Sequence, residues 1–194
     1  MRLIEQLKLH PSNSRLALLI RHADRELIPT GEIGNEIPIN KQGEQNSFAF
    51  GEKLKEHPVI KIFTSPIPRC VQTAEHISKG LGKELEIILT KCLGDPGLHV
   101  SDEVAAGEFY LKYGFDEMYK RFRYNEPIPG IPHADDYEKL MTEFLKTHTD
   151  ENGITIFITH DSLIAFYHYC LEKTVYTKEN WVNYLDGLLI NYRS

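Results

Sequence analysis

The feature that most constrains the fold is a short apolar run that stops at a charged cluster. Residues 16–20 read Leu-Ala-Leu-Leu-Ile, and residues 21–25 read Arg-His-Ala-Asp-Arg. Five apolar residues without alternation are typical of a strand that is buried on both faces, as in a parallel sheet. In open α/β sheets, ligands bind at the carboxyl ends of such strands. We therefore expect functional side chains directly after residue 20.

Strand-like and helix-like segments alternate along most of the chain. The segments with strand character cover residues 16–20, 59–63, 85–89, 154–158 and 188–192. The segments with helical character cover residues 2–10, 41–56, 68–79, 102–123, 135–146 and 163–171, with a short helical turn at 181–185. This alternation predicts an α/β fold, a three-layer sandwich in which helices cover both faces of a mainly parallel central sheet. The last strand is expected at a sheet edge.

The length of the chain fits a single domain. A chain of 194 residues can bury a full hydrophobic core, and no linker divides it, so residues 1–194 are predicted to form one domain. The segment 94–131 interrupts the regular pattern and is rich in aromatic residues, proline and glycine. We expect this segment to be an insertion that covers the active site. Its aromatic side chains either line the pocket or pack within the insertion.

Charge and composition exclude several classes of partner. The formal net charge is −6, which argues against nucleic acid and anionic membranes because both need a basic surface. No apolar run approaches the roughly 20 residues that span a bilayer. The N-terminal residues lack the apolar stretch of a secretory signal, and the cysteines are widely spaced. We expect a cytoplasmic protein, and nothing indicates an oligomer.

Three of the predicted strands end in polar clusters. Equivalent ends of parallel strands lie on one side of a sheet, so the clusters should converge. Arginine binds two phosphate oxygens at once, and several fixed cations around a histidine suit a tetrahedral dianion. We therefore expect a phosphate site without a metal, since no dense spacing of histidines and acids is present. The clusters are Arg21-His22-Ala23-Asp24-Arg25, Thr64-Ser65-Pro66-Ile67-Pro68-Arg69 and Thr159-His160-Asp161.

The same clusters resemble the motifs of a known family. Arg21-His22-Ala23 is similar to the RHG motif of the histidine phosphatase (phosphoglycerate mutase-like) superfamily. Residues 65–74, SPIPRCVQTA, resemble its second motif, SPLxRAxQTA, and Thr159-His160-Asp161 resembles the late strand that ends in the second catalytic histidine. The resemblance implies a phosphoglycerate mutase-like fold and an enzyme that needs no cofactor and acts on a phosphorylated small molecule.

The resemblance also implies a role for each matched residue. His22 would be the nucleophile that becomes a phosphohistidine, and His160 would be the second catalytic histidine. Arg21 and Arg69 would also stabilise charge in the transition state. The residues implied to bind the phosphate are Arg21, Arg25, Arg69, His160 and Ser65.

Two positions can supply the general acid. Asp161, together with Arg25, resembles the acid phosphatase and phytase branch, which predicts a histidine acid phosphatase-type phosphoric monoester hydrolase. The large helical domain of that branch is absent from this chain. The mutase branch instead takes its acid from a segment after the second motif, where Asp95 lies, with Asp102 and Glu103 nearby. Asp161 is the first choice and Asp95 the alternative.

The leading interpretation is a phosphatase that hydrolyses a phosphomonoester through a phosphohistidine intermediate. Three alternatives stay open: a phosphoglycerate mutase-type phosphotransferase, a phosphohistidine protein phosphatase, and a non-catalytic phosphate-binding module. The intact histidines and arginines argue against the non-catalytic module. Cys70 is expected to be a core residue. His99 is expected at the surface, with the pocket as the alternative because it is close to Asp95.

Overall fold

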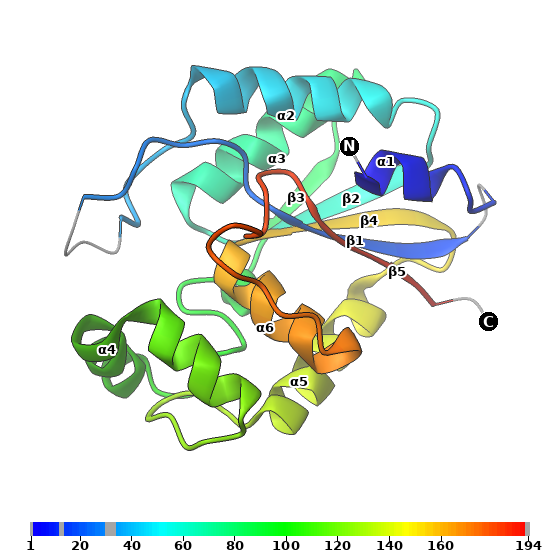
Figure 1. The fold of residues 1–194 in the computed structure, drawn as a ribbon. Coiled ribbons are helices and arrows are strands. Elements are labelled where there is room, and N and C mark those ends of the chain that lie inside the picture. Colours follow the sequence, from blue (N-terminus) through cyan, green and yellow to red (C-terminus); the bar gives the residue numbers. More distant parts are fainter. Residues whose placement is uncertain (1, 12–13, 30–33, 193–194) are drawn as a thin grey trace.

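The framework of the molecule is a five-stranded sheet with the order β3-β2-β4-β1-β5 (Figure 1). A computed structural model describes residues 2–11, 14–29 and 34–192. The four strands β1 to β4 run parallel to one another, whereas β5 pairs antiparallel with β1 at one edge. The predicted mainly parallel sheet and the edge position of the last strand are confirmed. The strands are β1 (Arg15–Arg21), β2 (Val59–Thr64), β3 (Glu86–Leu89), β4 (Gly153–Thr159) and β5 (Gly187–Asn191).

Helices cover both faces of this sheet, as Figure 1 shows. One face carries α1 (Arg2–Leu7), α2 (Lys41–Lys53) and α3 (Pro68–Leu81). The other face carries α4 (Glu103–Arg123), α5 (Ala134–His148) and α6 (Asp161–Glu172). A single 3-10 turn, η1 (Lys91–Leu93), follows β3. The predicted three-layer α/β sandwich is therefore confirmed.

The central strands are apolar throughout because both of their faces are covered. Leu18 and Ile20 of β1 pack with the core under α1, α2 and α3, whereas Leu19 packs with the core on the other face. This follows from the alternation of side chains along a strand. β1 and β4 are neighbours in register, with Arg21 opposite Thr159. The polar residues that follow the two strands consequently lie at the same end of the sheet.

The antiparallel strand β5 brings one more segment to this end. Gly187, its first residue, lies opposite Ile20 near the end of β1. The Arg21 backbone N–H donates to the Asp186 carbonyl at 3.0 Å. The loop before β5, residues 173–186, therefore lies at the polar end of the sheet, although it is far in sequence from the residues that follow β1.

The helices differ from the predictions in two places that concern the site. α6 begins at Asp161, two residues before its predicted start, so that Asp161 belongs to the first helical turn. Residues 181–185 were predicted to form a helical turn. They are instead irregular, with a turn at 184–185. α4 contains a kink at Gly114, whose φ of 76° lies in the left-handed region that glycine adopts without strain.

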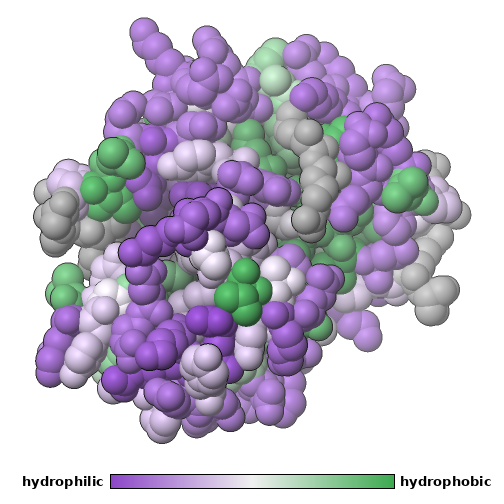
Figure 2. Space-filling model, viewed as in Figure 1, coloured by the Kyte–Doolittle hydropathy of each residue, from purple (hydrophilic) through white to green (hydrophobic). Residues whose placement is uncertain are grey.

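The face seen in Figure 2 is largely hydrophilic, with hydrophobic side chains in a few separate patches. Within the described residues, no helix combines the length and the apolar character needed to span a bilayer. The sequence of residues 24–40, which is rich in glycine and has no hydrophobic period, predicts a loop, and residues 30–33 of it lie outside the described residues.

Candidate active site

His22 and His160 meet at the carboxyl ends of β1 and β4. The His22 backbone N–H donates to the Thr159 carbonyl at 2.9 Å, which joins the two strand ends. The centroids of the two imidazole rings are 5.5 Å apart. The structure therefore brings together the two histidines that the sequence motifs predicted to act as a pair.

The protonation of His22 follows from its neighbours. Its Nδ1 lies 2.8 Å from the carbonyl oxygen of Ala23, which can only accept, so Nδ1 carries the proton. Its Nε2 accepts a hydrogen bond from Nε of Arg69 at 3.1 Å. Burial and the nearby His160 lower the pKa of His22 well below the usual histidine range. His22 is thus a neutral imidazole whose lone pair lies on Nε2.

Arg69 contacts both histidines. Besides its bond to His22, it donates from Nη2 to Nδ1 of His160 at 3.2 Å. Nε2 of His160 is therefore the protonated nitrogen, and it donates to Oγ of Ser65 at 3.1 Å. Burial, and after it the charge of Arg69, lowers the pKa of His160 to about 3. The buried guanidinium of Arg69, between two neutral imidazoles, forms a cationic site that suits an anionic oxygen of a ligand.

Residues of the second motif on one face of α3 hold the loop that follows β1. Residues three and four positions after Arg69 lie on the same face of the helix. The Ala23 backbone N–H donates to Oγ of Thr73 at 3.0 Å, and the Ile39 N–H donates to Oε1 of Gln72 at 3.0 Å. Both hydrogen bonds attach the loop after β1 to α3. The motif therefore positions this loop as well as Arg69.

Arg21 and Asp161 form an ion pair beside the histidines. Nη2 of Arg21 lies 2.8 Å from Oδ2 of Asp161, and the indole N–H of Trp181 donates to the same oxygen at 2.9 Å. The Arg21 guanidinium carbon lies 4.1 Å from the ring centre of Tyr184. Burial by itself raises the pKa of Asp161, but Arg21 and Trp181 outweigh it, so the net pKa is lowered. Asp161 is therefore ionised, and its carboxylate is held in the ion pair with Arg21.

Asp95 follows a residue in direct contact with His160. Gly94 packs so closely that a β-carbon there would lie 2.6 Å from the His160 ring and 2.6 Å from Oγ of Ser65. Asp95 itself has a φ of 70°, a conformation that is strained for most residues other than glycine. Its side chain is 35% exposed and pairs with Lys91 at 3.3 Å. Asp95 thus lies beside the second histidine and stays in contact with solvent.

One large cavity, of about 850 Å³, opens onto these residues. Arg25 lines the cavity and brings a second guanidinium beside that of Arg69. Arg21 and Ser65 do not line the cavity; they lie behind Asp161 and His160, where they hold those side chains. Their predicted contact with phosphate stays a prediction. The predicted residues that do line the cavity are His22, Arg25, Arg69, Asp95, Glu103, His160 and Asp161.

The structure also decides three smaller assignments. Asp102 caps the N-terminus of α4, where its carboxylate accepts the N–H groups of residues 104 and 105, so it does not line the cavity. Cys70 is fully buried, as predicted, and burial raises the pKa of its thiol to about 12. The prediction of His99 as a surface histidine was wrong. Its ring packs against Phe166 and lines the cavity, and burial lowers its pKa to about 4.

Several residues of the cavity wall were not marked by any motif. Tyr176, Lys178 and Trp181 come from the loop before β5, and Arg123 comes from the last turn of α4. The abundance of aromatic residues in 102–123 was a signal for α4. Nothing in the sequence pattern marked the loop, because its contribution depends on the antiparallel return of β5.

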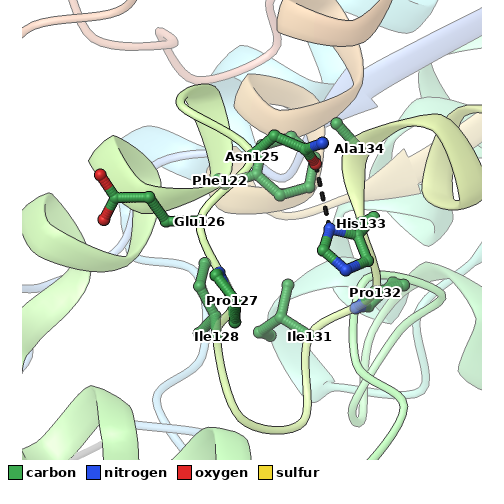
Figure 3. Close-up of a pocket in the computed structure, with 9 residues that line it drawn as sticks. All are labelled: Phe122, Asn125, Glu126, Pro127, Ile128, Ile131, Pro132, His133 and Ala134. Carbon is green, nitrogen blue, oxygen red and sulfur yellow. Dashed lines mark hydrogen bonds between the residues drawn. The ribbon is translucent and has the colours of Figure 1, made fainter.

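A second pocket, of about 90 Å³, lies in the loop between α4 and α5 (Figure 3). Its walls include Pro127 and Ile131, and Oδ1 of Asn125 lies 3.0 Å from Nδ1 of His133. This volume suits a few waters, so the larger cavity is the candidate active site. Within residues 2–11, 14–29 and 34–192, no three His, Cys, Asp or Glu side chains form a group that could hold a metal ion.

Comparisons with known proteins agree with this geometry. A family model described as the histidine phosphatase superfamily (branch 1) matches residues 17–178. The 6-phosphofructo-2-kinase/fructose-2,6-bisphosphatase of Aquarana catesbeiana is 27% identical over 165 residues, which cover 82% of this chain and 33% of that protein. The chain thus spans about a third of the length of this curated relative.

Solved structures match the fold. A phosphoglycerate mutase from Bacillus anthracis has a TM-score of 0.64 at 17% identity, covering 94% of this chain and 90% of that chain. A phosphoserine phosphatase from Entamoeba histolytica has a TM-score of 0.56 at 20% identity, covering 82% and 80%. These likenesses show a phosphoglycerate mutase-like fold. Because the family model also matches most of its length, the chain belongs to the histidine phosphatase superfamily.

Proposed function

We propose that this protein is a phosphatase that hydrolyses a phosphomonoester through a phosphohistidine on His22. The observation that carries the proposal is the state of that residue. Its Nδ1 proton is held by the Ala23 carbonyl, so the lone pair of Nε2 faces the buried Arg69. A neutral imidazole fixed in one tautomer beside a cation is prepared to attack phosphorus.

In the first step, Nε2 of His22 forms a bond to phosphorus while the bond to the leaving oxygen breaks. Arg69 donates to His22 in the free protein, so a phosphate oxygen would replace that nitrogen as the acceptor. Arg25, which lines the same cavity, would supply further donors. Such fixed donors stabilise the charge on the equatorial oxygens in the transition state.

We assign the general acid to Asp95. The leaving oxygen needs a proton, and Asp161 is disfavoured because Arg21 and Trp181 hold it as an anion. This weakens the acid phosphatase-type assignment, which depended on Asp161 as the acid. Asp95 lines the same cavity and follows the glycine that touches His160. Its partner Lys91, at 3.3 Å, is 75% exposed, so solvent screens this pair.

In the second step, the Asp95 carboxylate takes a proton from water while the water oxygen attacks phosphorus. The bond from phosphorus to His22 breaks, and inorganic phosphate and the free imidazole are released. A mutase would instead return the phosphoryl group to a bound acceptor. We also propose a cytoplasmic location, because the three widely spaced cysteines suggest no disulfide framework.

Hydrolysis of p-nitrophenyl phosphate in the presence of EDTA tests the proposal. We expect phosphate release by the natural chain and by His57→Ala, a histidine outside the cavity, and none by His22→Ala. Transfer of the phosphoryl group to an added phosphorylated acceptor, without release of phosphate, would favour the mutase. Absence of turnover on a broad panel of phosphorylated metabolites and phosphohistidine peptides would favour the non-catalytic module.

The acid is tested with a substrate that has a poor leaving group, because only such a group needs a proton. Asp95→Asn should reduce kcat for an alkyl phosphate by about 10²–10⁴ and reduce it much less for p-nitrophenyl phosphate. Asp161→Asn should affect both substrates to a similar degree, since it disturbs Arg21 rather than proton transfer. The opposite pattern would restore Asp161 as the acid.

A further inference from the structure

The cavity continues well beyond the residues that would hold a phosphate. We call the part lined by His22, Arg25, Arg69 and His160 the phosphate end. Away from it, the wall is formed by aromatic side chains from α4, α6 and the loop before β5. We call this part, lined by Phe115, Tyr119, Phe166 and Trp181, the ring end.

The rings of the ring end form one contiguous cluster around Phe115. Its ring centroid lies 5.3 Å from that of Trp181, 5.7 Å from Phe166 and 5.8 Å from Tyr119. Phe115 follows the kink at Gly114, which changes the direction of α4 at this point. Its side chain is neither fully buried nor hydrogen-bonded, and it lines the cavity. It therefore presents apolar ring surface to the cavity.

The charged residues beside this cluster include an ion pair and one arginine, Arg123, whose guanidinium carbon lies 5.0 Å from the ring centre of Tyr119. His99, which packs on Phe166, is neutral at pH 7 because burial lowers its pKa to about 4. Asp116 and Lys178, which also line the cavity, are paired with each other at 3.0 Å. A polar group buried against these rings without a partner would be destabilised, whereas an apolar group would gain by leaving water.

The cavity has room for a ligand much larger than phosphate. A volume of about 850 Å³ is in the range of sites for whole small molecules. A phosphate group occupies only the phosphate end. We propose, on the basis of the function proposed above, that the substrates are phosphomonoesters whose leaving group carries a flat apolar ring system. The phosphate would lie on Arg69 and the ring system against Phe115 and Trp181.

Binding of two phosphonates to the intact protein tests this inference without any effect of leaving-group chemistry. Methylphosphonate fills only the phosphate end, and (1-naphthyl)methylphosphonate adds a ring system. By titration calorimetry, we expect the naphthyl compound to bind about tenfold more tightly or better, because its apolar surface leaves water. Equal affinities, or no binding of either compound, would overturn the inference.

Variants of α4 locate the effect. Phe115→Ala and the conservative Phe115→Leu should each reduce the affinity ratio of the two compounds at least threefold and leave methylphosphonate binding unchanged. Tyr113→Ala is the matched control, since Tyr113 is on the same helix but does not line the cavity. Circular dichroism confirms that each variant is folded. An equal fall of the ratio in the Tyr113 and Phe115 variants would contradict the inference.

The experiments distinguish a failure of the proposed function from a failure of the ring end. A protein that shows the expected phosphonate ratio but hydrolyses no phosphomonoester would contradict the phosphatase proposal and keep the ring end as a binding site. A protein that hydrolyses alkyl and naphthyl phosphates and shows no phosphonate preference would keep the phosphatase and contradict the ring end.

Discussion

The two ends of the cavity are built in different ways. At the phosphate end, the histidines follow two paired central strands and are joined through the buried Arg69. At the ring end, the wall comes from a kinked helix, from α6 and from an irregular loop. The ion pair there, Asp116 with Lys178, is 71% and 80% exposed.

The difference corresponds to two physical demands. Chemistry needs reacting groups held within a fraction of an ångström, which central strands and buried hydrogen bonds provide. Recognition of an apolar group needs only matching shape and the exclusion of water, which loops and exposed helices can provide. Substitutions should therefore have large effects at the phosphate end and small ones at the exposed residues of the ring end, whereas Phe166 is fully buried and belongs to the core.

The largest effect is expected from Arg69→Ala. Loss of the guanidinium removes a phosphate donor and frees both histidines, so kcat/KM should fall by about 10²–10³. Arg69→Lys should recover little, because the ammonium lacks the planar fork that reaches both imidazoles. Steady-state kinetics measure this, with Arg121→Ala on α4 as the control. Activity of Arg69→Ala within threefold of the natural chain would contradict the proposed phosphate end.

The next effect concerns His99 and appears with pH. Burial lowers its pKa to about 4, whereas its ordinary value is 6.5. Between pH 6.5 and about pH 4, the His99 imidazole is protonated in the unfolded chain and neutral in the folded chain. The free energy of unfolding therefore falls as the pH is lowered. The change is about 1.4 kcal/mol per pH unit for one group.

His99→Phe should remove this part of the pH dependence. Urea unfolding at pH 7, 6 and 5 measures it, and the variant should lose less free energy of unfolding by pH 5 than the natural chain, by about 2 kcal/mol. His22 and His160 titrate in the same direction in both proteins. Identical pH dependence in the two proteins would show that His99 is not buried as described.

A smaller effect is expected from Thr73→Val. The variant keeps the shape of the side chain and removes the oxygen that accepts the Ala23 N–H. An unpaired buried N–H costs about 1 kcal/mol or more in free energy of unfolding. The loop after β1 should also lose position, so kcat should fall together with stability. Unchanged values of both would argue against a positioning role for α3.

The smallest effect is expected from Lys178→Ala at the ring end. The side chain and its partner Asp116 are both exposed, and exposed pairs contribute little. The midpoint of urea unfolding should not change measurably, and the double variant with Asp116→Asn should show no coupling. A clear destabilisation would show that the ring end is as rigidly fixed as the phosphate end.

The fold and the phosphate end were largely predictable. Strands buried on both faces leave uninterrupted apolar runs, so β1 and β4 were visible together with the residues that follow them. Parallel strands then required that His22 and His160 converge. The hydrogen bonds that distinguish Arg21 from Arg69 were not predictable, because two arginines in similar motifs take different partners. One pairs with Asp161, and the other bridges the histidines.

Most of the ring end could not be predicted from the sequence. Trp181 reaches the cavity because β5 returns antiparallel beside β1, a long-range pairing that local patterns do not contain. The stretch around it was predicted to be helical and is irregular. His99 was expected at the surface, with the pocket as the alternative. Its burial results from the packing of α5 and α6 around it.

The central claim is that Nε2 of His22 takes the phosphoryl group. The direct measurement is rapid acid-free quenching of the protein mixed with ³²P-labelled p-nitrophenyl phosphate, followed by mass spectrometry of the labelled peptide. We expect a label that is stable to alkali, lost in acid, located on residue 22 and absent from His22→Ala. A label on another residue, or its persistence in His22→Ala, would contradict the account.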